Sequence, residues 1–284
     1  MGGRTLITAR TEVDVRDLAL ELEGWFRERE NCLIAYSGGV DSGLLAYVSQ
    51  KVLGQKALSV LADGPALSGR ERSHAIDFAR EHGIELQVVH TKEMEKEGYL
   101  ANAGDRCYYC KQALFEKLEE VQGEVGKASD EERPVVYGVN LDDLGDYRPG
   151  LQAAKEADVM SPYLDLGINK ERVRELCRHY GLELSEKPAM PCLASRIPHG
   201  ERVDQKKLDQ IEKGEDFLYD LGVKVCRVRH HGELARIEVP ESDFLFVFEH
   251  GSSIQDYFVM LGFHFVSLDL GGFSSGKLNR TLGH

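Results

Sequence analysis

Residues 32–42 of the chain, CLIAYSGGVDS, decide the fold that we expect. Their first five residues form an apolar run typical of a buried strand, and the pattern of residues 43–53 predicts a helix. Between the two, Gly38 and Gly39 let the backbone turn tightly and point its N–H groups inward. The N-terminal end of the helix adds partial positive charge. The stretch therefore predicts a phosphate-binding loop between a strand and a helix.

The side chains of this loop suit the same purpose. Ser37 and Ser42 offer hydroxyl donors to phosphate oxygens, and Asp41 can cap the helix or hold a magnesium ion that bridges the phosphates. The alternative is a glycine-rich turn with a Ser or Asp cap, but the whole motif between a strand and a helix favours a nucleotide. It is neither the GxxxxGK[ST] loop, since no lysine follows, nor the GxGxxG dinucleotide loop.

Apolar strands and amphipathic helices alternate on either side of the loop. A helix is expected ahead of it, over residues 13–30. The further strands are expected at residues 57–61, 84–90, 134–139 and 159–160, the further helices at 68–82, 107–121, 151–157 and 170–180, and a polar loop at 122–133. This alternation predicts an α/β fold in which helices cover both faces of a parallel sheet.

The pattern changes after Pro188. Residues 187–200 contain three prolines and no periodicity, so they predict a loop and a domain boundary. The elements expected beyond it are a helix at 204–221, a strand hairpin at 223–230 and 233–239, a helix at 241–261 and a strand at 264–268. The chain is therefore expected to divide into a main α/β domain over 1–187, a smaller α+β domain over 188–270 and a flexible tail over 271–284.

The composition excludes several classes of protein. The 284 residues include 35 Lys and Arg against 48 Asp and Glu, which gives a formal net charge of −13. Hydrophobic residues make up 42%, enough for a globular core and too many for a disordered acidic protein. Binding along a nucleic acid needs a basic surface, so we expect no nucleic-acid partner. No apolar run suits a membrane span or a signal peptide, so we expect a cytoplasmic protein.

Three of the six cysteines stand in positions that favour chemistry. Cys107 and Cys110 form a CxxC at the start of a predicted helix, and Cys192 lies in the proline-rich loop close to Arg196. The CxxC is compatible with a redox dithiol, with half of a zinc site, or with a three-thiolate iron–sulfur site completed by Cys192. The other three are expected to be small core residues: Cys32, Cys177 and Cys226.

The motif SGGVDS at residues 37–42 resembles that of the PP-loop ATP pyrophosphatases, which have an adenine nucleotide alpha hydrolase-like fold. These enzymes cleave ATP between the α- and β-phosphates and adenylate a substrate oxygen. Together with DRCYYCK at 105–111, GVNLDDLGDYRPG at 138–150 and PCLASRIPHG at 191–200, it resembles the LarE family of ATP-dependent sacrificial sulfur transferases. The resemblance extends from about residue 13 to about residue 268.

The resemblance implies an enzyme of nickel-pincer nucleotide synthesis. The family adenylates a carboxylate of pyridinium-3,5-biscarboxylic acid mononucleotide and converts it into a thiocarboxylate. In one variant, a cysteine that matches Cys192 gives up its own sulfur and becomes dehydroalanine. In the other, cysteines that match Cys107, Cys110 and Cys192 hold a [4Fe-4S] cluster, which carries the transferable sulfide. All three are present, so we expect the cluster variant, with ATP and Mg²⁺ as further cofactors and a homo-oligomer, trimer or hexamer, as the assembly.

Further residues are candidates for holding ATP. Asp63 and Gly64 follow the second strand and are expected near the adenine or ribose. Asp142 and Asp143 follow an apolar strand at the carboxyl edge of the sheet, where they can bind magnesium or form a polar turn. Arg148, in the same loop, is a candidate for a phosphate contact.

A second set is expected to serve the substrate. Ser195 and Arg196 follow Cys192 and are candidates for contacts with the substrate phosphate. Arg227 and Arg229 alternate on a predicted strand and face one side, where they suit either that phosphate or partner carboxylates. The resemblance adds Glu215 as an active-site acid.

Three alternatives remain open at this point. A tRNA 2-thiolation enzyme would share the ATP chemistry and the cluster, but a polyanionic substrate suits this acidic chain poorly. An ammonia-using synthetase of the NAD type would have no use for the CxxC and Cys192. A non-enzymatic iron–sulfur or zinc storage module would keep only the shape of the nucleotide site.

Overall fold

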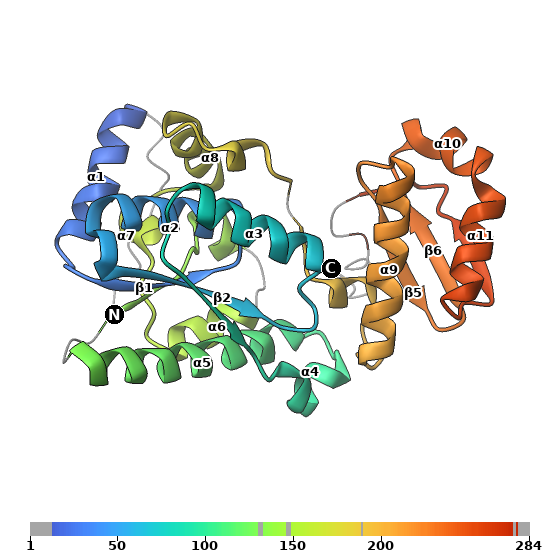
Figure 1. Cartoon of the computed structure of the whole chain (residues 1–284), viewed down its shortest axis with the longest axis horizontal. Coiled ribbons are helices and arrows are strands. Elements are labelled where there is room, and N and C mark those ends of the chain that lie inside the picture. Colours follow the sequence, from blue (N-terminus) through green and yellow to red (C-terminus); the bar gives the residue numbers. More distant parts are fainter. Residues whose placement is uncertain (1–12, 130–132, 146–148, 189, 275–276, 278–284) are drawn as a thin grey trace. The chain divides into compact units, whose positions relative to one another are not determined.

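The computed structural model divides the chain into two compact units (Figure 1). The residues that it describes are 13–129, 133–145, 149–188, 190–274 and 277. The first unit comprises residues 1–64, 69–93 and 107–190. The second comprises residues 65–68, 94–106 and 191–284. Two short stretches from the N-terminal half of the chain therefore belong with its C-terminal part, and the proline-rich stretch lies where the chain passes into the second unit.

A four-stranded parallel sheet forms the centre of the first unit. Its strands are β1 (Cys32–Tyr36), β2 (Ala57–Asp63), β3 (Leu86–His90) and β4 (Val135–Val136), in the order β3-β2-β1-β4. Every pairing between them is parallel. All five residues of β1 are buried, as a strand covered on both faces requires. The predicted α/β fold is confirmed.

Helices cover both faces of this sheet (Figure 1). On one face lie α1 (Val15–Arg27), α2 (Val40–Leu53), α3 (Gly69–Glu81) and α8 (Lys170–His179), and on the other α5 (Arg106–Ser129) and α6 (Pro149–Glu156). Because side chains alternate along a strand, Leu33 and Ala35 point toward α5 and α6. The core on that side contains Leu33, Ala35, Val60, Val89, Leu114, Phe115, Leu118, Val121, Ala153 and Ala154.

Three predicted elements of the first unit are wrong in extent, and one of them, the strand expected at 159–160, is only an isolated bridge between Met160 and Val136. The polar stretch expected as a loop from residue 122 continues α5 to Ser129, because Val125 packs against the same core as Val121 one turn earlier. The strand expected over 134–139 shortens to Val135–Val136. At Gly138 the chain approaches the start of α2 so closely that a Cβ atom would lie 3.2 Å from the Ser42 nitrogen.

The second unit is the smaller α+β structure that the sequence predicts. Strands β5 (Arg227–His231) and β6 (Leu234–Glu238) form an antiparallel hairpin that turns at Gly232, whose φ of +63° suits glycine. Strand β7 (Phe265–Leu268) pairs parallel to β6. Helix α9 (Gln205–Leu221) is capped by Asp204, which accepts a hydrogen bond from the Lys207 nitrogen at 2.9 Å.

The helix expected over 241–261 consists of two helices, α10 (Phe244–Glu249) and α11 (Gly251–Met260). They meet at His250, which ends the first helix and precedes the second. The remaining short helices are α4 (Glu97–Ala101) and α7 (Pro162–Asp165), with 3₁₀ turns at 54–56, 93–95, 141–145, 183–186, 193–196 and 241–243. In the described part of the chain, none of the helices is both long and apolar enough to span a membrane.

Candidate functional site

The glycine-rich loop between β1 and α2 has the geometry of an anion cradle. Gly38 has a φ of +70°, and a Cβ atom on it would lie 2.5 Å from the Cβ of Ala75, so no other residue fits. The backbone nitrogen of Ser37 donates to Oγ of Ser42 at 3.1 Å, and the two hydroxyl oxygens are 3.0 Å apart. The N-cap residue of α2 is Gly39, which has no side chain to accept a hydrogen bond from the N–H groups of the first turn.

Asp41 lies in the first turn of α2 and has two side-chain partners. Asn140 donates to its Oδ1 at 3.2 Å, and Nζ of Lys170 donates to its Oδ2. The Tyr163 hydroxyl also donates to the Asp41 carbonyl at 2.8 Å. The ammonium of Lys170 offsets the negative charge of Asp41 beside a loop whose shape suits an anion. Neither Lys170 nor Asn140 was predicted as a site residue, since the sequence marks them only by their places at an expected helix start and strand end.

A second lysine, Lys187, supports the turn of the loop. Its Nζ donates to the Gly38 carbonyl at 3.0 Å and pairs with Glu71 at 2.8 Å. Both charged side chains are largely buried. Lys187 lies in the proline-rich stretch, far from the loop in sequence, so only the folded chain shows that the two belong together.

The acidic residues at the carboxyl edge of the sheet bind backbone or arginine donors. Asp143 accepts from the Asn140 nitrogen at 3.0 Å, and Asp142 accepts from the Lys170 nitrogen at 2.9 Å. Asp63 accepts from Nε of Arg72 at 2.8 Å. These contacts are those of a polar turn, and a role in magnesium binding stays a prediction.

Two further candidates complete the nucleotide side. A Cβ atom on Gly64 would lie 2.0 Å from Oε1 of Glu93, so any other residue would displace that side chain. Arg148, expected to contact a phosphate, lies outside the described residues.

The six cysteines divide by exposure. Cys32, Cys177 and Cys226 are buried, as expected for core residues, and burial raises the pKa of Cys32 and of Cys177 to about 12. Cys107 and Cys192 are exposed and Cys110 is partly exposed. All six are free thiols. The accessible thiols are therefore the three that the sequence singles out.

The CxxC occupies the first turn of α5. Its spacing of three residues places Cys107 and Cys110 on one face of the helix. Lys111 follows, with Nζ 5.3 Å from the ring centroid of Tyr137. The phenol of Tyr137, and then the two thiols, raise the pKa of Lys111 above its usual range. A cation thus accompanies thiols whose ligand form is anionic, which suits thiolate ligation of iron.

Among the described residues, no three side chains of His, Cys, Asp or Glu lie close enough together to hold a metal ion. Cys107 and Cys110 belong to the first unit and Cys192 to the second.

A buried ion pair between Arg196 and Glu215 contacts the main chain of Cys192. Nε and Nη2 of Arg196 each donate to a carboxylate oxygen of Glu215 at 2.9 Å. Nη1 of Arg196 donates to the Cys192 carbonyl at 3.0 Å and to Oγ of Ser195 at 3.1 Å. Glu215 also accepts from the Val228 nitrogen at 3.0 Å. Arg196 and Glu215 therefore stabilise the loop of Cys192. That either of them acts on the substrate stays a prediction.

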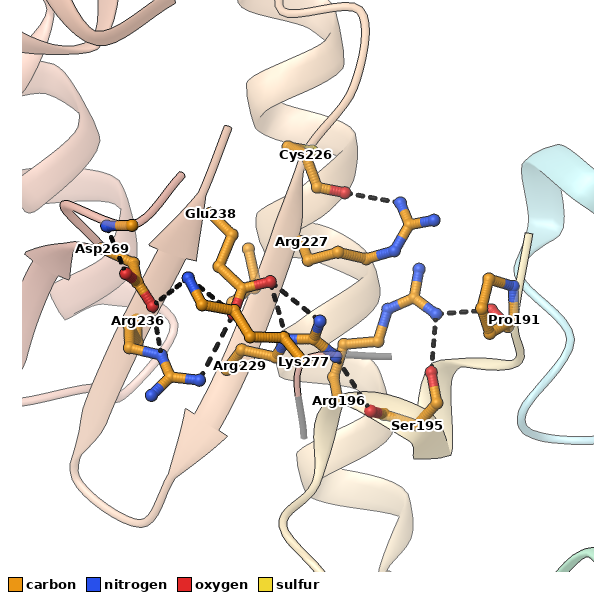
Figure 2. Close-up of polar contacts among 12 residues, drawn as sticks. Pro191, Ser195, Arg196, Cys226, Arg227, Arg229, Arg236, Glu238, Asp269 and Lys277 are labelled. Atoms are coloured by element: carbon orange, nitrogen blue, oxygen red, sulfur yellow. Dashed lines mark hydrogen bonds and ion pairs between the residues drawn. The ribbon is translucent and has the colours of Figure 1, made fainter. Parts of the chain in front are cut away.

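Arg227 and Arg229 lie on the same face of β5, as predicted (Figure 2). Arg229 donates twice to Oε2 of the fully buried Glu238, at 3.0 and 2.8 Å. Its third contact is the Ser195 carbonyl at 3.0 Å. Nη1 of Arg227 donates to the Cys226 carbonyl at 2.6 Å, and burial, followed by Arg196, lowers its pKa.

Further ion pairs extend this network, and Figure 2 shows Arg236, Glu238, Asp269 and Lys277 close together. Beyond the two ion pairs described above, Arg236 lies 3.3 Å from both Glu238 and Asp269, and Lys277 lies 2.8 Å from Asp269. The cations are Arg196, Arg227, Arg229, Arg236 and Lys277, and the carboxylates are Glu215, Glu238 and Asp269.

Comparison with known proteins relates the whole chain to one enzyme family. No protein-family model matches. Over 260 residues the chain is 33% identical to pyridinium-3,5-bisthiocarboxylic acid mononucleotide synthase of Lactiplantibacillus plantarum, which covers 90% of this chain and 91% of the relative. The chain belongs to the LarE family. Because the match covers 90% of the chain, it includes residues of both units.

Two further LarE-like relatives have no assigned activity. An uncharacterized protein of Synechocystis is 43% identical over 264 residues, which cover 92% of this chain and 96% of the relative. An uncharacterized protein of Methanocaldococcus jannaschii is 30% identical over 243 residues, or 86% of this chain and 90% of the relative.

Proposed function

We propose that this LarE-family protein is an ATP-dependent sulfur transferase that converts a carboxylate of pyridinium-3,5-biscarboxylic acid mononucleotide into a thiocarboxylate. The observation that carries the proposal is the 33% identity, across nine-tenths of the chain, to a synthase of the bisthiocarboxylic acid mononucleotide. The glycine-rich loop of the first unit and the accessible thiols support it independently.

The first step is adenylation of the substrate. A carboxylate oxygen attacks the α-phosphorus of ATP, the bond to the β-phosphate breaks, and pyrophosphate leaves. The loop N–H groups and the hydroxyls of Ser37 and Ser42 would bind the departing phosphates. Lys170 and Lys187 place positive charge at the same loop. A magnesium ion would be held by Asp41 and Asp143 and would neutralise phosphate charge.

The substrate's own phosphate would bind in the second unit. Arg227 and Arg229 face one side of β5, and Ser195 and Arg196 adjoin Cys192. The arginines gathered in this network support an anionic ligand, because a guanidinium suits a phosphate.

The second step replaces AMP by sulfur. A sulfur nucleophile attacks the carbonyl carbon of the acyl-adenylate, the bond to AMP breaks, and a thiocarboxylate remains. Cys107, Cys110 and Cys192 would hold a [4Fe-4S] cluster as thiolates, and that cluster would supply the sulfide. The CxxC on one face of the first turn of α5, and the cation that follows it, support thiolate ligation.

Mass spectrometry and iron analysis of anaerobically purified protein test the proposal. With substrate and MgATP we expect pyrophosphate release, a thiocarboxylate product and about four irons per chain. Loss of the elements of hydrogen sulfide at Cys192 would show instead that this cysteine gives up its own sulfur. Cys192→Ala should lose thiocarboxylate formation. Cys32→Ala is its matched control, because the Cys32 thiol is buried. Salt-sensitive binding and thiolation of tRNA, or no substrate-dependent pyrophosphate release, would overturn the proposal.

A further inference from the structure

The main chain around Cys192 is held by buried side chains, although the thiol itself is exposed. Arg229 donates to the Ser195 carbonyl from β5, and Arg196 to the Cys192 carbonyl from within the loop. A third arginine, Arg106, donates to the Ala194 carbonyl at 2.8 Å. The side chain of Arg106 comes from a stretch of the second unit that is remote in sequence, 88 residues before Ala194.

Asn102 makes the largest set of contacts with this loop. Its side-chain Nδ2 donates to the carbonyls of Pro198 at 2.8 Å and Glu201 at 3.1 Å. Its main-chain carbonyl accepts from the Gly200 nitrogen at 2.9 Å. Asn102 is fully buried and has a φ of +52°, a left-handed conformation that asparagine tolerates. Both donors of its amide group are therefore used to hold the loop.

Asn102 and Arg106 are hydrogen-bonded to each other. Nη1 of Arg106 donates to Oδ1 of Asn102 at 2.6 Å, so the amide oxygen orients the guanidinium toward Ala194. Both residues are buried, where leaving a polar group without a hydrogen-bond partner is costly. Arg106 is also the first residue of α5 and directly precedes Cys107. The clamp on the Cys192 loop is thus built into the turn that leads into the CxxC.

We propose that Asn102 and Arg106 are positioning residues for Cys192. They fix the main chain of its loop from the start of the CxxC helix, so that sulfur transfer requires them although neither touches the substrate. The inference rests on the proposed function. Misplacing a reacting group by about 1 Å can lower a rate on the order of a hundredfold, so a clamp of this kind is functionally significant.

Two substitutions and a matched control test the clamp in the full chain. Asn102→Gly keeps the left-handed backbone and removes the amide contacts. Arg106→Lys keeps the charge but can reach fewer of the acceptors. Arg202→Met is the control, because Arg202 joins the same two stretches through Glu97 on the surface and contacts no carbonyl near Cys192.

The readouts are pyrophosphate release, thiocarboxylate formation and hydrogen exchange of the loop amides. For Asn102→Gly in a single turnover we expect a pyrophosphate burst at a rate within twofold of wild type, a ten- to hundredfold slower formation of thiocarboxylate, and faster exchange in residues 192–203. For Arg106→Lys we expect a smaller loss, and for Arg202→Met none.

Thiocarboxylate formation at the wild-type rate in both variants would overturn the inference. So would an equal fall in the rate of the single-turnover pyrophosphate burst and in the rate of thiocarboxylate formation, since it would indicate general destabilisation. A wild-type protein that releases no pyrophosphate would refute the proposed function instead, and the exchange measurement would still decide whether the clamp exists.

Discussion

Acidification from pH 7 to pH 5 should destabilise the second unit through one buried imidazole, that of His230. This side chain is 3% exposed, and its Nε2 lies 3.1 Å from Oε1 of Gln210. Its Nδ1 is buried and has no hydrogen-bond partner among the described residues, so a proton added there has no acceptor. Burial, and then the charge of Lys207, lowers the pKa of His230 from 6.5 to about 4, against the opposing effect of Asp204.

The sign and size follow from linkage between protonation and folding. Below pH 6.5 the unfolded chain binds a proton that the folded chain does not, so stability present above pH 6.5 is lost as the pH falls toward 4. Between pH 7 and pH 5 the loss from this one group is about 2 kcal/mol. The adjacent His231, whose pKa burial also lowers, acts in the same direction.

Hydrogen exchange in β5 and α9 at several pH values is the appropriate assay, because it reports on this unit alone. His230→Gln places an amide near Gln210 that does not titrate, and should lose about 2 kcal/mol less than wild type between pH 7 and pH 5. His264→Gln, on an exposed side chain, is the matched control and should behave as wild type. An equal pH dependence in wild type and His230→Gln would refute the reasoning.

Three further predictions concern charge and backbone geometry. Lys170→Met leaves Asp41 of the glycine-rich loop without its ammonium partner and should raise the KM for ATP about tenfold in a pyrophosphate assay. Lys155→Met, which changes an exposed side chain of α6, should leave that KM unchanged. Arg229→Met removes the partner that bonds Glu238 twice and should lower stability by about 3 kcal/mol in thermal unfolding, with partial recovery when Glu238→Gln is added; no loss would contradict the buried pair. Gly38→Ala forces a Cβ against α3 at a φ of +70° and should abolish measurable ATP binding by calorimetry; binding at wild-type affinity would show that the loop conformation is different.

The buried arginines have a consequence for how the second unit would bind its substrate. Arg196 and Arg229 each donate to a buried carboxylate and to a carbonyl of the stretch from Cys192 to Ser195. The ion pairs set the directions of both guanidiniums before any ligand arrives. An anion that binds in this network would therefore meet preorganised donors and would also contact the side chains that hold the reactive loop.

Local patterns were sufficient to predict the strand, the glycine-rich turn and the helix at residues 32–53. The reason is that a left-handed glycine, a short apolar run and a helix start depend on neighbouring residues. The division of the cysteines into buried and accessible thiols also followed from their local surroundings. Local patterns predicted a loop at residues 122–129, where the structure has the end of α5. Most residues there are polar, and the apolar face of the helix continues only through Val121 and Val125.

The sequence by itself determined the parallel α/β fold, the glycine-rich turn between β1 and α2, and the three accessible cysteines of this LarE-family chain. Only the tertiary structure decided which charges pair: Lys170 with Asp41 across 129 residues, Arg196 with Glu215, and Arg106 with the loop of Cys192. The physical reason is that an ion pair depends on distance and burial in the folded chain, and sequence spacing constrains neither across separate elements.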